Sequence, residues 1–145
     1  MPVTLPPLLQ LQRGLPLLLP LALAHVQAGF PSPADDFAVK RIDLNDILIT
    51  HPQATYLLRV AGDSMRDAGI FDGDTIVCNR ALRARHGNVV VATVDGEFTC
   101  KYLHQRAGRV KLRAANPTFP EIVPREGQTL EVFGVVTATI KRFPV

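Results

Sequence analysis

The alternation of apolar and polar positions predicts that most of this chain folds as β-strands. Tyr56, Leu58 and Val60 occupy every second position over residues 54–61, and Gly62 ends the run. A period of two is typical of a strand with one buried face. Further strands are predicted over residues 75–79, 88–94, 97–103, 109–113 and 131–141.

Two short signals indicate how these strands are joined and bent. Asp95-Gly96 separates the runs 88–94 and 97–103, and this dipeptide between two strands strongly favours a tight β-hairpin. Gly134 interrupts the Val- and Thr-rich final strand, which suggests a β-bulge. Short strands at this spacing predict a compact, curled sheet.

The residues before the first β run differ in character. Asp43 can cap a short helix over residues 44–49, with Asp46 in the capping-box position and Pro52 closing the segment. Most of the 12 prolines lie within residues 1–36, which favours an extended arm over a long helix. We therefore expect an N-terminal arm over residues 1–36 and a β-rich domain over residues 37–145.

Composition narrows the class of protein. The 145 residues are 47% hydrophobic and 20% charged, as expected of one folded domain. A net charge of +3 is too small for the footprint of a free-standing DNA-binding protein, and the chain has neither a glycine-rich phosphate loop nor a helix-turn-helix pair. Cys78 and Cys100 lie in β-patterned runs without zinc-ligand spacing, so we expect two reduced, buried thiols.

The arm contains a segment that permits a second interpretation. An apolar run over residues 15–24 follows Arg13, and Val26-Gln27-Ala28 satisfies the small-residue rule of signal peptidases. Pro16 and Pro20 interrupt this run, and ten residues are too few to cross a bilayer as a helix. Export with a leader that ends at Ala28 therefore remains an alternative, and no membrane span is expected.

Ser64 and Lys101 are the candidate catalytic residues. Ser64 follows a predicted strand within the turn 62–65, and a serine hydroxyl needs a nearby base to become a nucleophile. None of the four histidines stands in a recognisable triad, whereas Lys101 lies inside the strand 97–103, on the face of Thr99 and Leu103. Lowering a lysine pKa from about 10.4 to about 7 requires roughly 4.6 kcal/mol, which only an apolar pocket supplies.

Taken alone, the pair is weak, because Ser64 and Lys101 are 37 positions apart and each also fits a purely structural role. Several other short motifs strengthen the catalytic interpretation of the pair. They occur in the same order, and with nearly the same spacing, as in one known family. The chain resembles the UmuD-type SOS mutagenesis proteins and LexA peptidase domains of the serine-lysine autopeptidase family (peptidase S24) over about residues 28–143. The matching segments are residues 29–34, 43–45, 62–65, 69–74, 94–101, 116–117 and 133–136.

The resemblance implies a LexA/UmuD-like curled-sheet peptidase domain and a role for each candidate residue. Ser64 is the expected nucleophile, Lys101 the neutral general base, and the backbone N–H groups of Asp63 and Ser64 the expected oxyanion donors. The bond expected to be cut is the chain's own, between Ala28 and Gly29. A small Ala28 suits a shallow pocket, and Gly29 lets the backbone approach closely.

The resemblance also implies partners. A cytoplasmic homodimer is expected, whose cleavage is stimulated by a RecA-ssDNA filament and whose trimmed form joins a Y-family (UmuC-type) polymerase subunit in translesion synthesis. No cofactor, metal or sequence-specific DNA binding is expected. Residues 1–27 are richer in leucine and proline than the usual UmuD arm, and Ala28 stands where UmuD tends to have cysteine. A catalytically vestigial interaction subunit is the main alternative, and a LexA-like repressor is disfavoured.

Five further charged residues have ordinary structural interpretations. Arg109, Lys111 and Arg113 share one strand face and could contact DNA or an acidic partner, but a plain solvated face is favoured. Asp72 and Asp74 flank Gly73 as turn-forming residues, and a metal site there is improbable without further acidic neighbours.

Overall fold

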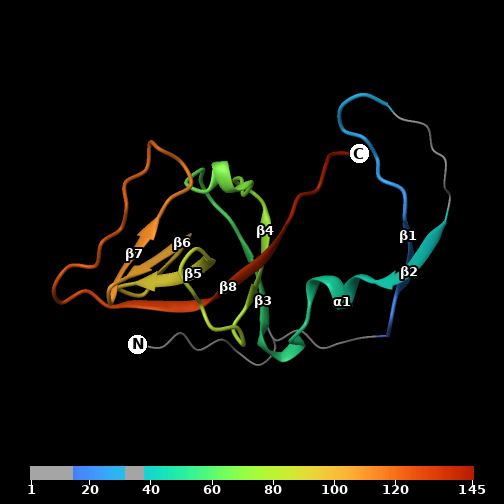
Figure 1. The fold of residues 1–145 in the computed structure, drawn as a ribbon. Coiled ribbons are helices and arrows are strands. Elements are labelled where there is room, and N and C mark those ends of the chain that lie inside the picture. Colours follow the sequence, from blue (N-terminus) through green and yellow to red (C-terminus); the bar gives the residue numbers. More distant parts are fainter. Residues whose placement is uncertain (1–14, 32–37) are drawn as a thin grey trace. The chain divides into compact units, whose positions relative to one another are not determined.

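A computed structural model of the chain describes residues 15–31 and 38–145 (Figure 1). The described residues form two compact units that divide between Thr50 and His51. This division lies beyond residue 36, where the arm was expected to end, because the segment after residue 37 pairs with a strand of the arm. The parts of the predicted arm at residues 1–14 and 32–36 lie outside the described residues.

The first unit is a two-stranded ribbon followed by one short helix. Strand β1 (Leu18–Ala22) pairs antiparallel with β2 (Val39–Asp43), and this ribbon was not predicted. Helix α1 (Leu44–Leu48) follows directly, and the Asp43 carboxylate caps it by accepting a hydrogen bond of 2.9 Å from the Asn45 N–H. The predicted cap and helix are therefore confirmed. All five residues of β1 are exposed.

The second unit is a single six-stranded antiparallel sheet, and its six strands correspond to the six runs in which strands were predicted. Its strands run in the order β3-β4-β8-β5-β6-β7, so the final strand lies in the middle of the sheet (Figure 1). The strands are β3 (Thr55–Arg59), β4 (Thr75–Asn79), β5 (Val89–Val94), β6 (Glu97–Arg106), β7 (Arg109–Arg113) and β8 (Leu130–Ile140), with 3-10 turns η2 (Pro52–Ala54) and η3 (Arg66–Ala68).

The predicted hairpin and bulge are both present. Strands β5 and β6 are joined through Asp95 and Gly96, whose φ angles of 50° and 84° both lie in the left-handed region that tight hairpin turns require. The register of β8 against β5 shifts beside Gly134 and leaves Phe133 as the extra residue of a bulge. A Cβ atom on Gly134 would lie 2.6 Å from the Cys78 Sγ, so only glycine fits there.

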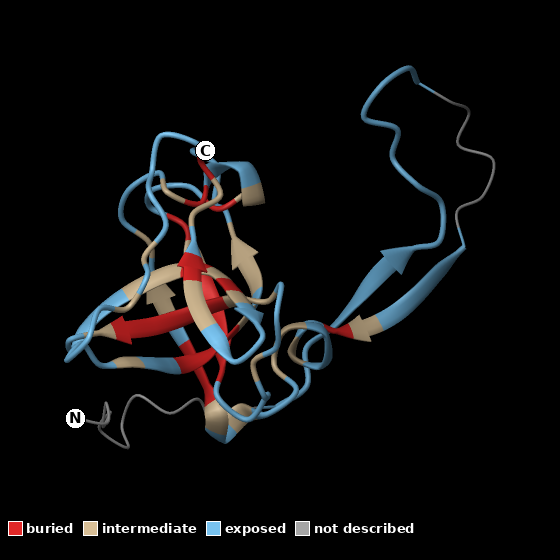
Figure 2. Ribbon diagram, turned by 60° about the vertical axis from the view of Figure 1, so that its left-hand side comes forward, coloured by how far each residue is buried: buried red, intermediate tan, exposed pale blue. Residues whose placement is uncertain are grey.

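The core consists of two buried clusters. Buried residues are concentrated in the central strands of the sheet (Figure 2). Val91 of β5 belongs to one cluster, and its neighbours Val90 and Ala92 belong to the other, as expected of a strand covered on both faces. The first cluster includes Met65, which is 2% exposed, so the residue after Ser64 anchors that loop in the core.

Both cysteines are free thiols, as predicted. Cys78 is fully buried, and burial raises its pKa to about 12, whereas Cys100 is only half-buried and burial raises its pKa to about 11. Both thiols are therefore protonated at neutral pH. Among the described residues, no helix is long and apolar enough to cross a membrane.

Candidate active site

Ser64 is presented by a turn that follows β3 and begins at Gly62, whose φ of 89° lies in the left-handed region. The N–H of Gly62 donates to the Asp72 carboxylate at 2.7 Å, and the N–H of Arg66 donates to the Asp63 carbonyl at 3.2 Å. Met65, the residue after Ser64, is buried in the core. The turn is therefore held in place both before and after Ser64. The tight turn predicted around Ser64 is therefore present.

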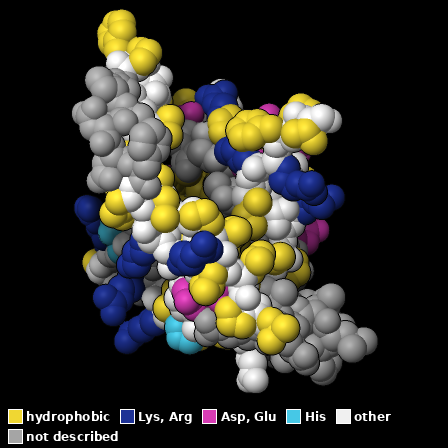
Figure 3. All heavy atoms as spheres, turned by 90° about the vertical axis from the view of Figure 1, so that its right-hand side faces the viewer, with side chains coloured by type: hydrophobic (Ala, Val, Ile, Leu, Met, Phe, Trp, Pro, Cys, Tyr) yellow, Lys and Arg dark blue, Asp and Glu magenta, His cyan; other side chains and the backbone are white. Residues whose placement is uncertain are grey.

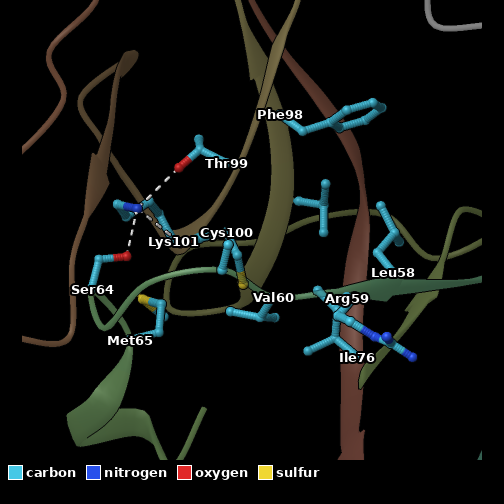
Figure 4. A pocket seen from close by; sticks show the side chains of 12 residues that line it. Leu58, Arg59, Val60, Ser64, Met65, Ile76, Phe98, Thr99, Cys100 and Lys101 are labelled. Carbon is cyan, nitrogen blue, oxygen red and sulfur yellow. Dashed lines mark hydrogen bonds between the residues drawn. The ribbon is translucent and has the colours of Figure 1, made fainter. Parts of the chain in front are cut away.

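Lys101 reaches the Ser64 hydroxyl from the middle of β6, where it pairs with Val90 of β5. Its Nζ lies 2.8 Å from the Ser64 Oγ, 2.9 Å from the Thr99 Oγ1 and 3.1 Å from the Cys100 carbonyl oxygen (Figure 4). Only 9% of Lys101 is exposed, and this burial lowers the pKa of its amine from the ordinary value.

The three contacts of Lys101 match the hydrogen-bonding capacity of a neutral amine as well as that of an ammonium. An ammonium donates all three protons, whereas a neutral amine donates two and accepts one hydrogen bond through its lone pair. The Cys100 carbonyl can only accept, so the lone pair must face a hydroxyl, and Ser64 offers one at 2.8 Å. In the neutral form, this arrangement lets Nζ take the proton of the Ser64 hydroxyl.

A cavity of about 240 Å³ adjoins this pair (Figure 4). Strands β3, β4, β5 and β6 and the Ser64 turn contribute its walls, and most of the lining side chains are apolar. They include Leu58, Val60, Met65, Ile76, Val91 and Phe98. Phe98 is 47% exposed and packs edge-to-face on the bulge residue Phe133, with ring centroids 5.3 Å apart. The apolar pocket that a neutral lysine requires is thus present.

No histidine lines this cavity or contacts Ser64 in the part of the chain that the structure describes. His51 interacts with the side chain of Asn79, with 2.9 Å between their nitrogens. His86 packs against His104 and accepts a hydrogen bond from the backbone N–H of Gln105. The described residues therefore leave Lys101 as the base nearest the hydroxyl.

Sequence reasoning missed two side chains that hold the Ser64 turn. Asp72, expected only as a turn former, accepts from Gly62, and the amide of Asn116 donates to the Asp63 carbonyl at 2.9 Å. The backbone N–H of Ala115 also donates to the Ser64 carbonyl at 2.8 Å. Asn116 was part of one matching segment, but no sequence pattern connects it with a residue 53 positions earlier.

Ala28 and Gly29, the predicted cleavage site, lie in the first unit, in the segment after β1. Both residues are exposed, and nothing lies within 4 Å of the position of a Cβ on Gly29. Exposed hydrophobic side chains are numerous on the face shown in Figure 3. The exposed hydrophobic side chains of the described arm include Leu15, Leu17, Leu18, Leu21, Leu23, Val26 and Phe30.

Several of the other charged groups have structural partners. Lys111 and Arg113 form ion pairs of 2.9 and 2.7 Å with Glu121, which balances part of the cationic face of β7. Asp74 is buried and accepts hydrogen bonds from Lys141 and from the Phe71 N–H. Among the described residues, no three or more His, Cys, Asp or Glu side chains are grouped so that they could hold a metal ion.

A mostly antiparallel β domain with a serine and a buried lysine in contact at an apolar cavity is typical of the serine-lysine class of hydrolases. Comparison with known families is consistent with this class. The family model described as Peptidase S24-like matches residues 20–137. The chain belongs to this family, and the family membership inferred from the sequence is confirmed.

Individual relatives are similar over most of their length. The chain is 43% identical to protein SamA of Salmonella typhimurium over 85% of either chain. It is 44% identical to protein ImpA of Escherichia coli over 85% of this chain and 83% of the relative. It is also 43% identical to the LexA repressor of an Azoarcus species, of which it covers 61%.

Proposed function

We propose that this protein is a serine peptidase that cuts its own chain between Ala28 and Gly29. The observation that carries the proposal is the 2.8 Å contact between the Lys101 Nζ and the Ser64 Oγ within a buried, apolar environment. Membership of the S24 family supports the peptidase chemistry. The exposed Ala28-Gly29 segment suits a bond that must enter a cleft in extended form.

The proposed reaction proceeds in two stages. Neutral Lys101 takes the Ser64 proton as Oγ forms a bond to the Ala28 carbonyl carbon, and the negative charge develops on the Ala28 oxygen. The bond to the Gly29 nitrogen then breaks, and Lys101 returns the proton to that nitrogen, which leaves as the amine. A water molecule, deprotonated by Lys101, then hydrolyses the Ser64 ester and frees the Ala28 carboxylate.

In the cell, we propose a regulated, essentially single-turnover cleavage that produces an accessory subunit of an error-prone translesion polymerase. The similarity to SamA, MucA and ImpA over more than four fifths of the chain supports this assignment, together with the resemblance to UmuD-type proteins. The proposal includes a cytoplasmic homodimer, stimulation by a RecA-ssDNA filament and a Y-family polymerase subunit as the final partner.

Intact-mass analysis of the purified chain tests the peptidase. The wild type and the Ser64→Ala variant are incubated at alkaline pH and, separately, with RecA, single-stranded DNA and a nucleotide. We expect the loss of residues 1–28 from the wild type alone, because only Ser64 supplies the nucleophile. An uncut wild type under both conditions would instead indicate a vestigial interaction subunit.

The Ser64→Ala variant expressed in cells separates self-cleavage from export. A leader removed by a signal peptidase would also leave Gly29 at the mature N-terminus, so the terminus alone is not diagnostic. Processing in cells that persists in Ser64→Ala, together with recovery of the protein outside the cytoplasm, would favour export.

A further inference from the structure

Asn116 lies behind the Ser64 turn and is 5% exposed. Its Nδ2 donates to the Asp63 carbonyl at 2.9 Å, and its Oδ1 accepts from the Thr118 N–H at 3.1 Å and the Thr118 hydroxyl at 2.9 Å. A backbone N–H can only donate, so Thr118 fixes which end of the amide is oxygen. The end that faces Asp63 must then be the nitrogen.

Holding the Asp63 carbonyl also determines where the next N–H points. The chain has no cis peptide among its described residues, and in a planar trans peptide the C=O and N–H point in opposite directions. The Ser64 N–H shares its peptide plane with the Asp63 carbonyl. It is therefore turned away from Asn116.

The groups around the turn fit this orientation. Ser64 lines the catalytic cavity, whereas Asn116 lines a separate hollow on the surface, together with Asp67 and Phe119. The Ser64 carbonyl is also held on the Asn116 side, through the N–H of Ala115. Within the described residues the Ser64 N–H has no hydrogen-bond acceptor, which leaves it available to a ligand.

We infer that Asn116 is a positioning residue that keeps the Ser64 N–H aimed at the oxyanion of the reaction. The inference rests on the proposed self-cleavage. A donor that is already oriented stabilises the developing charge without reorganising during the reaction, and removal of such a donor typically lowers the rate about 10²- to 10³-fold. Asn116 does not touch the substrate in this scheme, because it acts through the Asp63–Ser64 peptide.

The test measures the first-order self-cleavage rate across pH for the wild type, Asn116→Asp, Asn116→Ser and Thr118→Val. Asn116→Asp keeps the size of the side chain and the acceptor for Thr118, but it replaces the donor to Asp63 with an acceptor. Thr118→Val is the matched control, because it removes one contact to the Asn116 Oδ1 and leaves the contact to Asp63 in place.

We expect the plateau rate of Asn116→Asp to fall by about 10- to 100-fold, somewhat less than for outright loss of a donor. In Asn116→Ser, which adds no charge near the amine, the pH midpoint that reports Lys101 should not move. Thr118→Val should cleave close to the wild-type rate. A purely structural role would instead lower the melting temperature and the rate of Asn116→Asp and Thr118→Val together. If Asn116→Asp does not fold, Asn116→Ser, which buries no charge, replaces it in the comparison.

The outcomes separate this inference from the proposed function. If the wild type cleaves and the Asn116 variant cleaves at the same rate, the role of Asn116 is overturned, but the peptidase function is not. A shift of the pH midpoint in the uncharged variant Asn116→Ser would overturn the role of Asn116 too, because the residue would then act on Lys101. A wild type that never cleaves would overturn both the peptidase and this role.

Discussion

At the scale of single residues, the side-chain amine of Lys101 lies in surroundings that disfavour its charged ammonium form. Lys101 is almost wholly buried, with three oxygen atoms around Nζ and an apolar cavity beside it. Burial penalises the charged form, so the folded protein shifts this lysine toward the neutral amine that can act as a base. Thr99, two positions earlier on the same strand face, holds the amine in place.

This environment predicts the pH dependence of self-cleavage. In the proposed mechanism the active form is the neutral amine, so the rate should rise with pH through the Lys101 pKa and level off above it. Because burial lowers that pKa, the midpoint should lie below the ordinary lysine value of 10.5. Cleavage rates from pH 6 to 11, followed by intact mass, give the midpoint.

Lys101→Arg is the matched variant for this profile. Arginine keeps a long cationic side chain but remains protonated throughout the accessible pH range. We expect no cleavage at any pH, with a folded protein by circular dichroism. Self-cleavage of this variant at high pH would contradict the role of Lys101 as a base.

At the scale of elements, the bulge in β8 connects the packing of the sheet to the wall of the cavity. Phe133 is the extra residue of the bulge, and its ring packs on both Tyr56 and the cavity residue Phe98. Gly134 permits the bulge because β8 approaches Cys78 too closely for any side chain.

Gly134→Ala should therefore destabilise the fold. The added methyl would collide with the fully buried Cys78 Sγ, and overpacking of this kind typically costs about 1–3 kcal/mol of unfolding free energy. Urea unfolding of Gly134→Ala measures the loss. The double variant Gly134→Ala/Cys78→Ala removes the sulfur that the methyl would meet. Its loss of unfolding free energy should therefore be smaller than the sum of the losses in Gly134→Ala and Cys78→Ala. Additive effects would show that the contact with Cys78 is not the cause.

Local patterns were enough to predict the elements of the sheet, whereas contacts distant in sequence were not predictable. Strand β4 has the predicted bounds, and β6 runs past residue 103 only because β7 continues to pair with it up to Arg106. The sequence of β1 contains a proline and does not predict a strand. The segment is a strand because it pairs with β2. The clamp of Asn116 on Asp63 likewise depends on tertiary structure, since the two residues are 53 positions apart.

At the scale of the whole peptidase unit, Asp74 ties the start of β4 to the end of the chain. Its buried carboxylate accepts from Lys141, just beyond β8, and from Thr139 within β8, and it also accepts from the Phe71 N–H. Although burial raises the pKa of Asp74, these hydrogen bonds and the Lys141 charge outweigh burial and lower the pKa below the ordinary value of 3.8.

This carboxylate should contribute to acid stability. A lowered folded-state pKa gives stability that is present above the unfolded pKa and is lost as pH falls through the folded one. Asp74→Asn should therefore lose about 1–3 kcal/mol at pH 7, with a difference from wild type that shrinks below about pH 4. Chemical denaturation at pH 7 and pH 3 checks this, and an equal difference at the two pH values would contradict it.

The ribbon of the first unit gives the proposed cleavage a consequence beyond shortening the chain. Strand β1 precedes the Ala28-Gly29 bond and β2 follows it, so the cut would leave two separate polypeptides, which the described residues connect through the β1–β2 ladder. Pairing within one chain benefits from an effective concentration in the millimolar range, which disappears when the link is cut. All five residues of β1 are exposed, so burial of β1 itself adds little to the ladder, and its departure would uncover the backbone edge of β2. Cleavage would thus irreversibly expose the edge of β2. A strand from a different protein chain could then pair with this edge in place of β1.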